Sequence, residues 1–98
     1  MVTTYTLNIP QEVMPQNKAH IAQHIAAYLA SQFERSNIIY ANKQYEVIDS
    51  DDNLLAAIQA VQETMVTIKT QTPWQGGKKD LEKRIFEYLK QPVASLQA

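Results

Sequence analysis

The sequence of 98 residues contains no cysteine and only two glycines. Without cysteine the chain cannot form a disulfide, a thiol nucleophile or a cysteine-ligated zinc site. With so little glycine it contains neither the GxGxxG dinucleotide fingerprint nor the phosphate loop GxxxxGK(S/T). We therefore expect no cofactor. Because cysteine usage does not identify a compartment, a cytoplasmic location is only the default expectation.

A strong charge of one sign and long apolar runs are also absent. Nine lysines and arginines against ten aspartates and glutamates give a net charge of −1, which argues against a general nucleic-acid binder or a cationic membrane-surface protein. No apolar stretch approaches the roughly 18 residues that span a bilayer, and the N-terminus lacks the pattern of a signal peptide. We therefore expect no membrane partner.

The sequence does contain enough apolar material for one domain. Hydrophobic residues make up 45% of the chain and charged residues 19%, which is typical of a folded domain rather than of a disordered chain. We expect residues 1–92 to form a single α+β domain and residues 93–98 to form a flexible C-terminal tail.

Residues 15–36 form the longest amphipathic stretch. The large apolar residues in it are spaced as on one side of an α-helix; they are Ile21, Ile25, Tyr28, Leu29 and Phe33. Pro15 suits the first turn of this helix, where a missing N–H is no loss. Full burial would stabilise the fold by ~1.5–3 kcal/mol for each large side chain. Most other apolar segments are therefore expected to pack against this helix.

Residues 3–9 alternate between apolar and polar side chains. This alternation predicts a half-buried strand, which Pro10 ends. Tyr5, Leu7 and Ile9 would face the core, and the residues between them would face away from it.

Two further runs of strand-forming residues, 38–40 and 45–48, flank Asn42-Lys43. Asparagine tolerates the positive φ that a tight turn needs, so we favour a hairpin. In this hairpin Tyr40 and Tyr45 would face each other. The alternative is one longer strand with a bulge.

The segment 49–70 can be interpreted in two ways. Its acidic start, residues 49–53, is typical of a helix N-cap. Helical spacing continues through four apolar residues: Leu54, Ile58, Val61 and Met65. Residues 64–70 are rich in β-branched side chains, which favours a strand, although no Gly, Pro or Asn interrupts the helical pattern there. We favour the strand, because a lone hairpin plus one strand makes a thin sheet.

Residues 72–77 hold both glycines and predict a loop. A last amphipathic helix would begin at Lys79 or Asp80, and Gln91-Pro92 would end it. Its apolar positions are Leu81, Ile85, Phe86, Tyr88 and Leu89.

Taken in order, these elements follow the β-α-β-β-α-β arrangement of ferredoxin-like domains. We therefore predict a small antiparallel sheet of three or four strands, packed on two helices and followed by a C-terminal helix. If residues 64–70 were helical, the sheet would have three strands and the fold would have three helices. The fold class is α+β in both cases.

His20 and His24 lie four residues apart, so both can point at one metal ion from the side of a helix. Zinc needs a third protein ligand and usually a fourth, and the glutamate of the HExxH motif is missing here. Two histidines beside the apolar stripe, bonded to water or backbone, are the simpler interpretation. They remain weak metal candidates.

The best anion-binding candidate lies around the start of the last helix, where free N–H groups and lysines can attract a phosphate. The candidate residues are Gly76, Gly77, Lys78, Lys79, Lys83 and Arg84, and Trp74 is placed to stack on a base. Glu82 and Glu87 dilute the positive charge, and a lysine-rich helix face is usually just solvated. A nucleic-acid-binding regulator is therefore the alternative function.

Residues 4–9 resemble the first-strand motif of RNA-recognition domains, with Tyr5 at the stacking position. The second motif of those domains expects a Gly-aromatic-Gly-aromatic pattern, of which residues 43–48 keep only Lys43 and Tyr45. The same start also resembles ribbon-helix-helix repressors, whose two helices are separated by a glycine turn that is missing here. Neither resemblance assigns the chain to a family.

The favoured function is a non-enzymatic protein–protein interaction module, such as an adaptor, inhibitor, immunity protein or regulatory subunit. Its anchors would be Trp74, in a Pro/Gly loop, and Tyr40 and Tyr45, at the hairpin tip. The alternative is that these aromatic residues cap the core. The partner would be another protein of unknown identity, and a free edge strand also allows a homodimer. No motif indicates catalysis.

Overall fold

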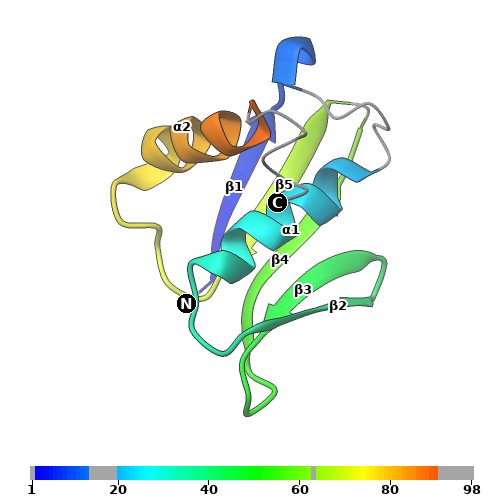
Figure 1. The fold of residues 1–98 in the computed structure, drawn as a ribbon, viewed down its shortest axis with the longest axis vertical. Coiled ribbons are helices and arrows are strands. Elements are labelled where there is room, and N and C mark those ends of the chain that lie inside the picture. Colours follow the sequence, from blue (N-terminus) through cyan, green and yellow to red (C-terminus); the bar gives the residue numbers. More distant parts are fainter. Residues whose placement is uncertain (1, 14–19, 63, 91–98) are drawn as a thin grey trace.

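The computed structural model describes residues 2–13, 20–62 and 64–90. One antiparallel sheet of five strands carries two α-helices across the same face (Figure 1). The elements are β1 (Thr3–Asn8), a 3-10 turn (Gln11–Val13), α1 (Ile21–Ser31), β2 (Asn37–Ala41), β3 (Gln44–Ile48), β4 (Leu54–Ala60), β5 (Met65–Thr70) and α2 (Gly77–Leu89). The prediction of an α+β fold with an antiparallel sheet is confirmed.

The strand order is β1-β5-β4-β3-β2, and every neighbouring pair is antiparallel. The four strands from β2 to β5 form a continuous meander, and β1 pairs with the last of them. As a result, β1 and β2 are the two edges of the sheet, and α1 links them across its face (Figure 1).

The alternation predicted for the first strand is confirmed. Tyr5, Leu7 and Ile9 are buried, whereas the side chains between them are exposed. Val13 follows in the 3-10 turn and is also buried. These residues form the part of the core that α2 covers, together with Leu81 and Ile85.

The predicted stripe of the long helix is confirmed within α1, but the helix ends at Ser31 and not at Ser36, so Phe33 lies in the turn that follows it. Ile21, Ile25 and Leu29 are at most 1% exposed, and small residues between them, Ala22 and Ala26, are buried as well. Because these alanines are small, α1 can pack closely on β3 and β4. The part of the prediction that covers residues 15–19 lies outside the described residues.

The predicted hairpin is confirmed as β2 and β3. Tyr40 is paired with Tyr45, and their ring centroids lie 4.9 Å apart in an edge-to-face arrangement. Asn42 and Lys43 have φ values of 55° and 61°, which is the backbone of a two-residue type I′ turn.

The helix predicted from Leu54 is wrong, because residues 54–60 form β4. This strand lies in the middle of the sheet, between β3 and β5, so both of its sides have hydrogen-bonding partners. Sheet pairing therefore overrides the helical preference of its leucines and alanines. Ala56, Ala57 and Ile58 are all at most 3% exposed. The strand favoured for residues 64–70 is confirmed as β5.

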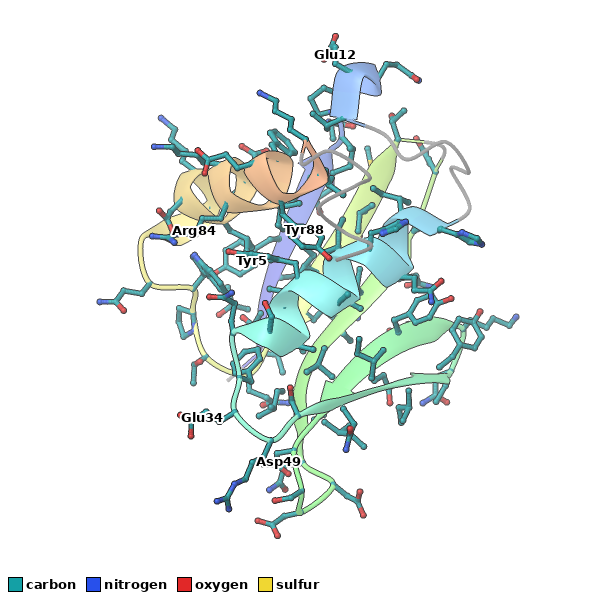
Figure 2. All side chains as sticks on the ribbon, in the orientation of Figure 1. Tyr5, Glu12, Glu34, Asp49, Arg84 and Tyr88 are labelled. Carbon is teal, nitrogen blue, oxygen red and sulfur yellow. The ribbon has the colours of Figure 1, made fainter. Side chains whose placement is uncertain are left out.

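The acidic segment 49–53 is a turn between β3 and β4 and not a helix N-cap (Figure 2). Oδ1 of Asp49 accepts hydrogen bonds of 2.9 Å from the backbone N–H groups of Asp51 and Asn53. These bonds lower the pKa of Asp49, with the bond from Asn53 as the main cause. Asp52 has a positive φ of 64° in the same turn.

The ferredoxin-like order is also corrected, and the sheet has five strands instead of three or four. That order needs a second crossing helix between the third and fourth strands. The chain has β4 in this place, so the strands continue as a meander and no second crossover forms on the sheet.

The last helix, α2, begins at Gly77 and ends at Leu89, so it starts two residues before the predicted Lys79. Figure 2 shows Tyr88 pointing from α2 toward α1, where its ring centroid lies 5.2 Å from that of Tyr28. The predicted helix end at residues 91–92 and the predicted tail at residues 93–98 lie outside the described part of the chain. Neither α1 nor α2 has the length and apolar character that crossing a membrane requires.

Candidate functional site

Trp74 is held in place by two hydrogen bonds. Its backbone N–H donates to the hydroxyl oxygen of Tyr5 at 2.7 Å. Its indole N–H donates to Oδ2 of Asp80 at 2.8 Å. The side chain is partly buried and packs against the core. Trp74 therefore joins β1 to α2 and caps the core between them, which matches the alternative interpretation of this aromatic.

Tyr5 lies under α2 and is 8% exposed. An RNA-recognition domain needs its stacking aromatic on an open sheet face. The sheet order and the burial of Tyr5 therefore do not support the resemblance of residues 4–9 to the first strand of an RNA-recognition domain.

Asp80 also accepts a hydrogen bond from Nε of Arg84 at 2.8 Å, one helical turn away. The bond from Trp74 is the main cause that lowers the pKa of Asp80, and the bond from Arg84 follows. Asp80 in turn raises the pKa of Arg84. The guanidinium that was predicted to meet a phosphate is thus engaged by a carboxylate.

The two glycines do not form an open phosphate cradle. The N–H of Gly77 donates to the carbonyl of Trp74 at 2.9 Å. A Cβ on Gly76 would stand 2.7 Å from Cβ of Asp80, so an acidic side chain occupies the space in front of this glycine. This carboxylate would repel an anion at the N-terminus of α2.

A groove of about 680 Å³ runs between this loop, α2 and the C-terminal end of α1. Phe33 and Trp74 supply its large apolar surface, and Asp80 and Arg84 are the charged residues that line it. The two charges are paired with each other through Nε of Arg84 and Oδ2 of Asp80, so they largely offset one another in the groove.

The lysines of the basic segment are solvated. Lys78, Lys79 and Lys83 are all exposed on α2. They remain available to a polyanion, whereas the indole N–H of Trp74 and Nε of Arg84 are bonded to Asp80, which leaves the terminal amino groups of Arg84 as the other donors nearby.

His20 and His24 lie at the N-terminal end of α1, and their ring centroids are 6.5 Å apart. A metal ion would need further ligands next to them. Within the described ranges, the structure forms no group of three or more His, Asp or Glu side chains that could hold a metal ion.

The outer edge of the sheet at β2 has a different character. Ile38, Ile39 and Tyr40 are consecutive and are 38%, 40% and 65% exposed. Each is a large apolar side chain, and the strand Asn37–Ala41 contains no charged residue and no proline. We call this strand the β2 edge. Natural proteins usually protect such an edge with charges, proline or a bulge. Here the register shift occurs between β3 and β4, at Val47/Ile48, and not in β2.

A small cleft of about 270 Å³ lies beside the β2 edge. Tyr40 and Tyr45 line one part of it, and Ala22 of α1 and Ile58 of β4 line another. The tyrosine pair thus lines a cleft of mixed polar and apolar character, to which Lys43, Gln44 and Gln59 also contribute.

The structure separates the predicted anchors into two places. Tyr40 of the β2 edge and Tyr45 of the neighbouring strand β3 lie together. Trp74 lies in the loop between β5 and α2, and β5 pairs with β1, the opposite edge strand. Asp80, Ile38 and Ile39 were not among the predicted site residues. An uncharged run, Asn-Ile-Ile-Tyr-Ala, was the available signal for the last two.

Comparisons with known protein families, with curated proteins and with solved structures find no match for this chain.

Proposed function

We propose that this chain is a small non-enzymatic protein–protein interaction module that binds through the β2 edge, as an adaptor, inhibitor, immunity protein or regulatory subunit would. One observation carries the proposal. Three consecutive large apolar side chains, from Ile38 to Tyr40, are exposed on an uncharged strand at the edge of a sheet. Such an edge is a template for pairing with another extended chain.

The surroundings of the β2 edge fit this mode of binding. An added strand gains affinity from backbone hydrogen bonds and specificity from pockets that receive alternate side chains. The cleft of about 270 Å³ beside Tyr40 is a candidate for such a pocket, in which the rings of Tyr40 and Tyr45 supply apolar surface and Gln44 and Gln59 supply polar groups. A partner strand with an apolar side chain at the matching position would fill it.

The larger groove next to Trp74 supports the non-enzymatic part of the proposal. General acid–base catalysis needs a side chain that can exchange a proton with the substrate. In this groove the carboxylate of Asp80 already accepts bonds from Trp74 and Arg84. These contacts favour a structural role for Asp80.

The proposal predicts that a partner can be trapped at the β2 edge. A photo-crosslinking amino acid is placed at Ile39 in one variant and at Thr6 in another. Both positions are exposed or half-exposed on edge strands, but Thr6 belongs to β1. We expect crosslinked protein adducts from position 39 in growing cells, identified by mass spectrometry, and about tenfold fewer from position 6.

A charge at the edge provides the matching loss-of-function test. Ile39→Lys is expected to remove the adducts formed from position 38, because a charged side chain at the centre of an edge strand opposes strand addition. Circular dichroism should show a folded protein, since Ile39 is already 40% exposed. Equal adducts from β1 and β2, or adducts that survive Ile39→Lys, would contradict the proposal.

A nucleic-acid-binding regulator is the second candidate, and one observation favours it. Lys78, Lys79 and Lys83 are exposed within the first two turns of α2, where the positive end of the helix dipole adds to their charge. Phosphates could be bound there without help from Trp74 or Arg84.

This second candidate predicts salt-sensitive binding. If about three phosphates are contacted, raising salt from about 50 to about 200 mM should weaken binding roughly 40-fold. The measurement is fluorescence anisotropy with labelled single-stranded RNA and double-stranded DNA. Lys78→Glu with Lys79→Glu should abolish the signal, and Lys43→Glu, in the hairpin turn, should not. No binding at the lower salt concentration would reject this candidate.

A further inference from the structure

We propose that the β2 edge pairs with the β2 edge of a second copy of this chain, in an antiparallel register centred on Ile39. The inference rests on the proposed function, because it names the partner of the same strand. It would join two sheets of five strands into one continuous sheet, with a two-fold axis between the two β2 strands, level with their central residue.

The backbone of β2 has hydrogen-bonding groups available for such a pairing. Both residues of the β2–β3 turn have positive φ, as in a type I′ turn. The pair that closes this turn, Ala41 and Gln44, is a hydrogen-bonded pair. Along an antiparallel ladder, hydrogen-bonded pairs alternate with non-hydrogen-bonded pairs. Ile38 and Tyr40 therefore direct their N–H and C=O groups away from β3, and no described strand lies on that side.

Symmetry restricts the register. Residues that oppose each other in an antiparallel pair point to the same face of the sheet, so the two-fold axis must be perpendicular to the sheet and pass through one residue pair. With Ile39 on the axis, Ile38 of each copy opposes Tyr40 of the other. Both outward-facing residues of β2 then become members of hydrogen-bonded pairs, and each pair exchanges two N–H···O bonds.

The side chains match in this register. On the face that carries the helices, Ile38 of one copy lies beside Tyr40 of the other, next to the cleft of about 270 Å³. On the opposite face Ile39 meets Ile39 in a non-hydrogen-bonded pair, where the Cα atoms are only about 4.5 Å apart. All three exposed apolar side chains of β2 thus gain an apolar neighbour.

The charges allow the pairing. The strand itself is uncharged, and the net charge of −1 causes little general repulsion between copies. The charge nearest the axis is Glu46 of β3, the cross-strand partner of Ile39, and one copy of it lies on each side of the axis. Arg35 and Lys43 follow just outside the strand, where positive φ values turn the chain. These like charges oppose each other across the two ends, so added salt should leave the dimer unchanged or strengthen it.

A single cysteine tests the register, because the natural chain has none. In Ile39→Cys the two thiols would face each other across the axis, at a separation that a disulfide can bridge with small adjustment. Under mild oxidation we expect a disulfide-linked dimer to form roughly tenfold or more faster than in Thr6→Cys, the control on the other edge strand. Both proteins are first checked for folding by circular dichroism.

Two off-axis variants make the test specific to the register. In this register the cysteine of Ile38→Cys in one copy would lie opposite the cysteine of Tyr40→Cys in the other copy, and neither would lie opposite its own counterpart. A mixture of the two should therefore form the mixed disulfide in preference to either homodimer. Preferred self-linkage of Ile38→Cys or of Tyr40→Cys would overturn a register centred on Ile39.

Sedimentation velocity of the wild-type chain supplies an independent readout. We expect a dimer at high micromolar concentration that persists in high salt, and a monomer for Ile39→Lys. A wild-type monomer, together with equal oxidation rates for Ile39→Cys and Thr6→Cys, would overturn the self-pairing. Crosslinks from position 39 to a different protein would then still support the proposed function, whereas no crosslinks at all would remove both.

Discussion

At the scale of single residues, Gly76 and Gly77 are two neighbouring positions that both have positive φ but differ in the packing around them. Their φ values are 100° and 80°, both in the region that favours glycine. A Cβ at Gly76 would collide with the side chain of Asp80 at 2.7 Å, whereas a Cβ at Gly77 would meet nothing within 4 Å. Gly76 is therefore required both by its backbone and by the position of Asp80.

Substitution of these glycines should give unequal losses of stability. Gly77→Ala should lower the free energy of unfolding by about 1–2 kcal/mol, from backbone strain alone. Gly76→Ala adds the collision with Asp80 and should lower it by more than about 2 kcal/mol. Urea unfolding followed by the fluorescence of Trp74 measures both. Equal losses would mean that Asp80 moves aside without effect on its bonds to Trp74 and Arg84.

Single residues also mark where sequence patterns stop being informative. Tyr5, Trp74 and Asp80 are joined by hydrogen bonds, but Tyr5 and Trp74 are far apart in the chain. Trp74 was predicted as a surface anchor because it lies in a Pro/Gly loop. Whether its indole finds a partner depends on where α2 packs, and no local pattern contains that information.

At the scale of elements, the local signals were sufficient for β1, α1, the β2–β3 hairpin and α2. Each of these has a clear period or turn residue within its own segment. Residues 54–60 were wrongly predicted as helix because their leucines and alanines are good helix formers. Their conformation is decided by β3 and β5 on either side. In the same way, the sequence identified β2 as a strand but not as an edge, because edges are defined by pairings elsewhere.

At the scale of the whole molecule, two carboxylates in different elements of the fold connect stability to pH. Hydrogen bonds lower the pKa of Asp49 in the β3–β4 turn and of Asp80 on α2, below the ordinary value of 3.8. Because the folded-state pKa values lie below the unfolded ones, these groups stabilise the fold above pH 3.8. This stabilisation is lost as the pH falls through the lowered values.

The acid unfolding of the protein should therefore depend on both aspartates. We expect the urea midpoint to stay nearly constant from pH 7 to pH 5 and to decrease below pH 3.8. Asp80→Asn and Asp49→Asn should each reduce the slope below pH 3.8, because the amide does not titrate. Urea titrations between pH 2 and pH 7, followed by circular dichroism, measure this effect. A slope equal to that of the wild type in both variants would contradict it.

The pairing of β1 with β5 determines when this protein can mature on the ribosome. Tyr5 leaves the exit tunnel before the rest of the sheet is made, but its cross-strand neighbour Ile68 belongs to the last strand of that sheet. Until that strand emerges, the nascent β1 has no ladder to join, and contacts so distant in sequence form slowly. Translation must therefore pass through nearly the whole meander before the N-terminus can be locked into place.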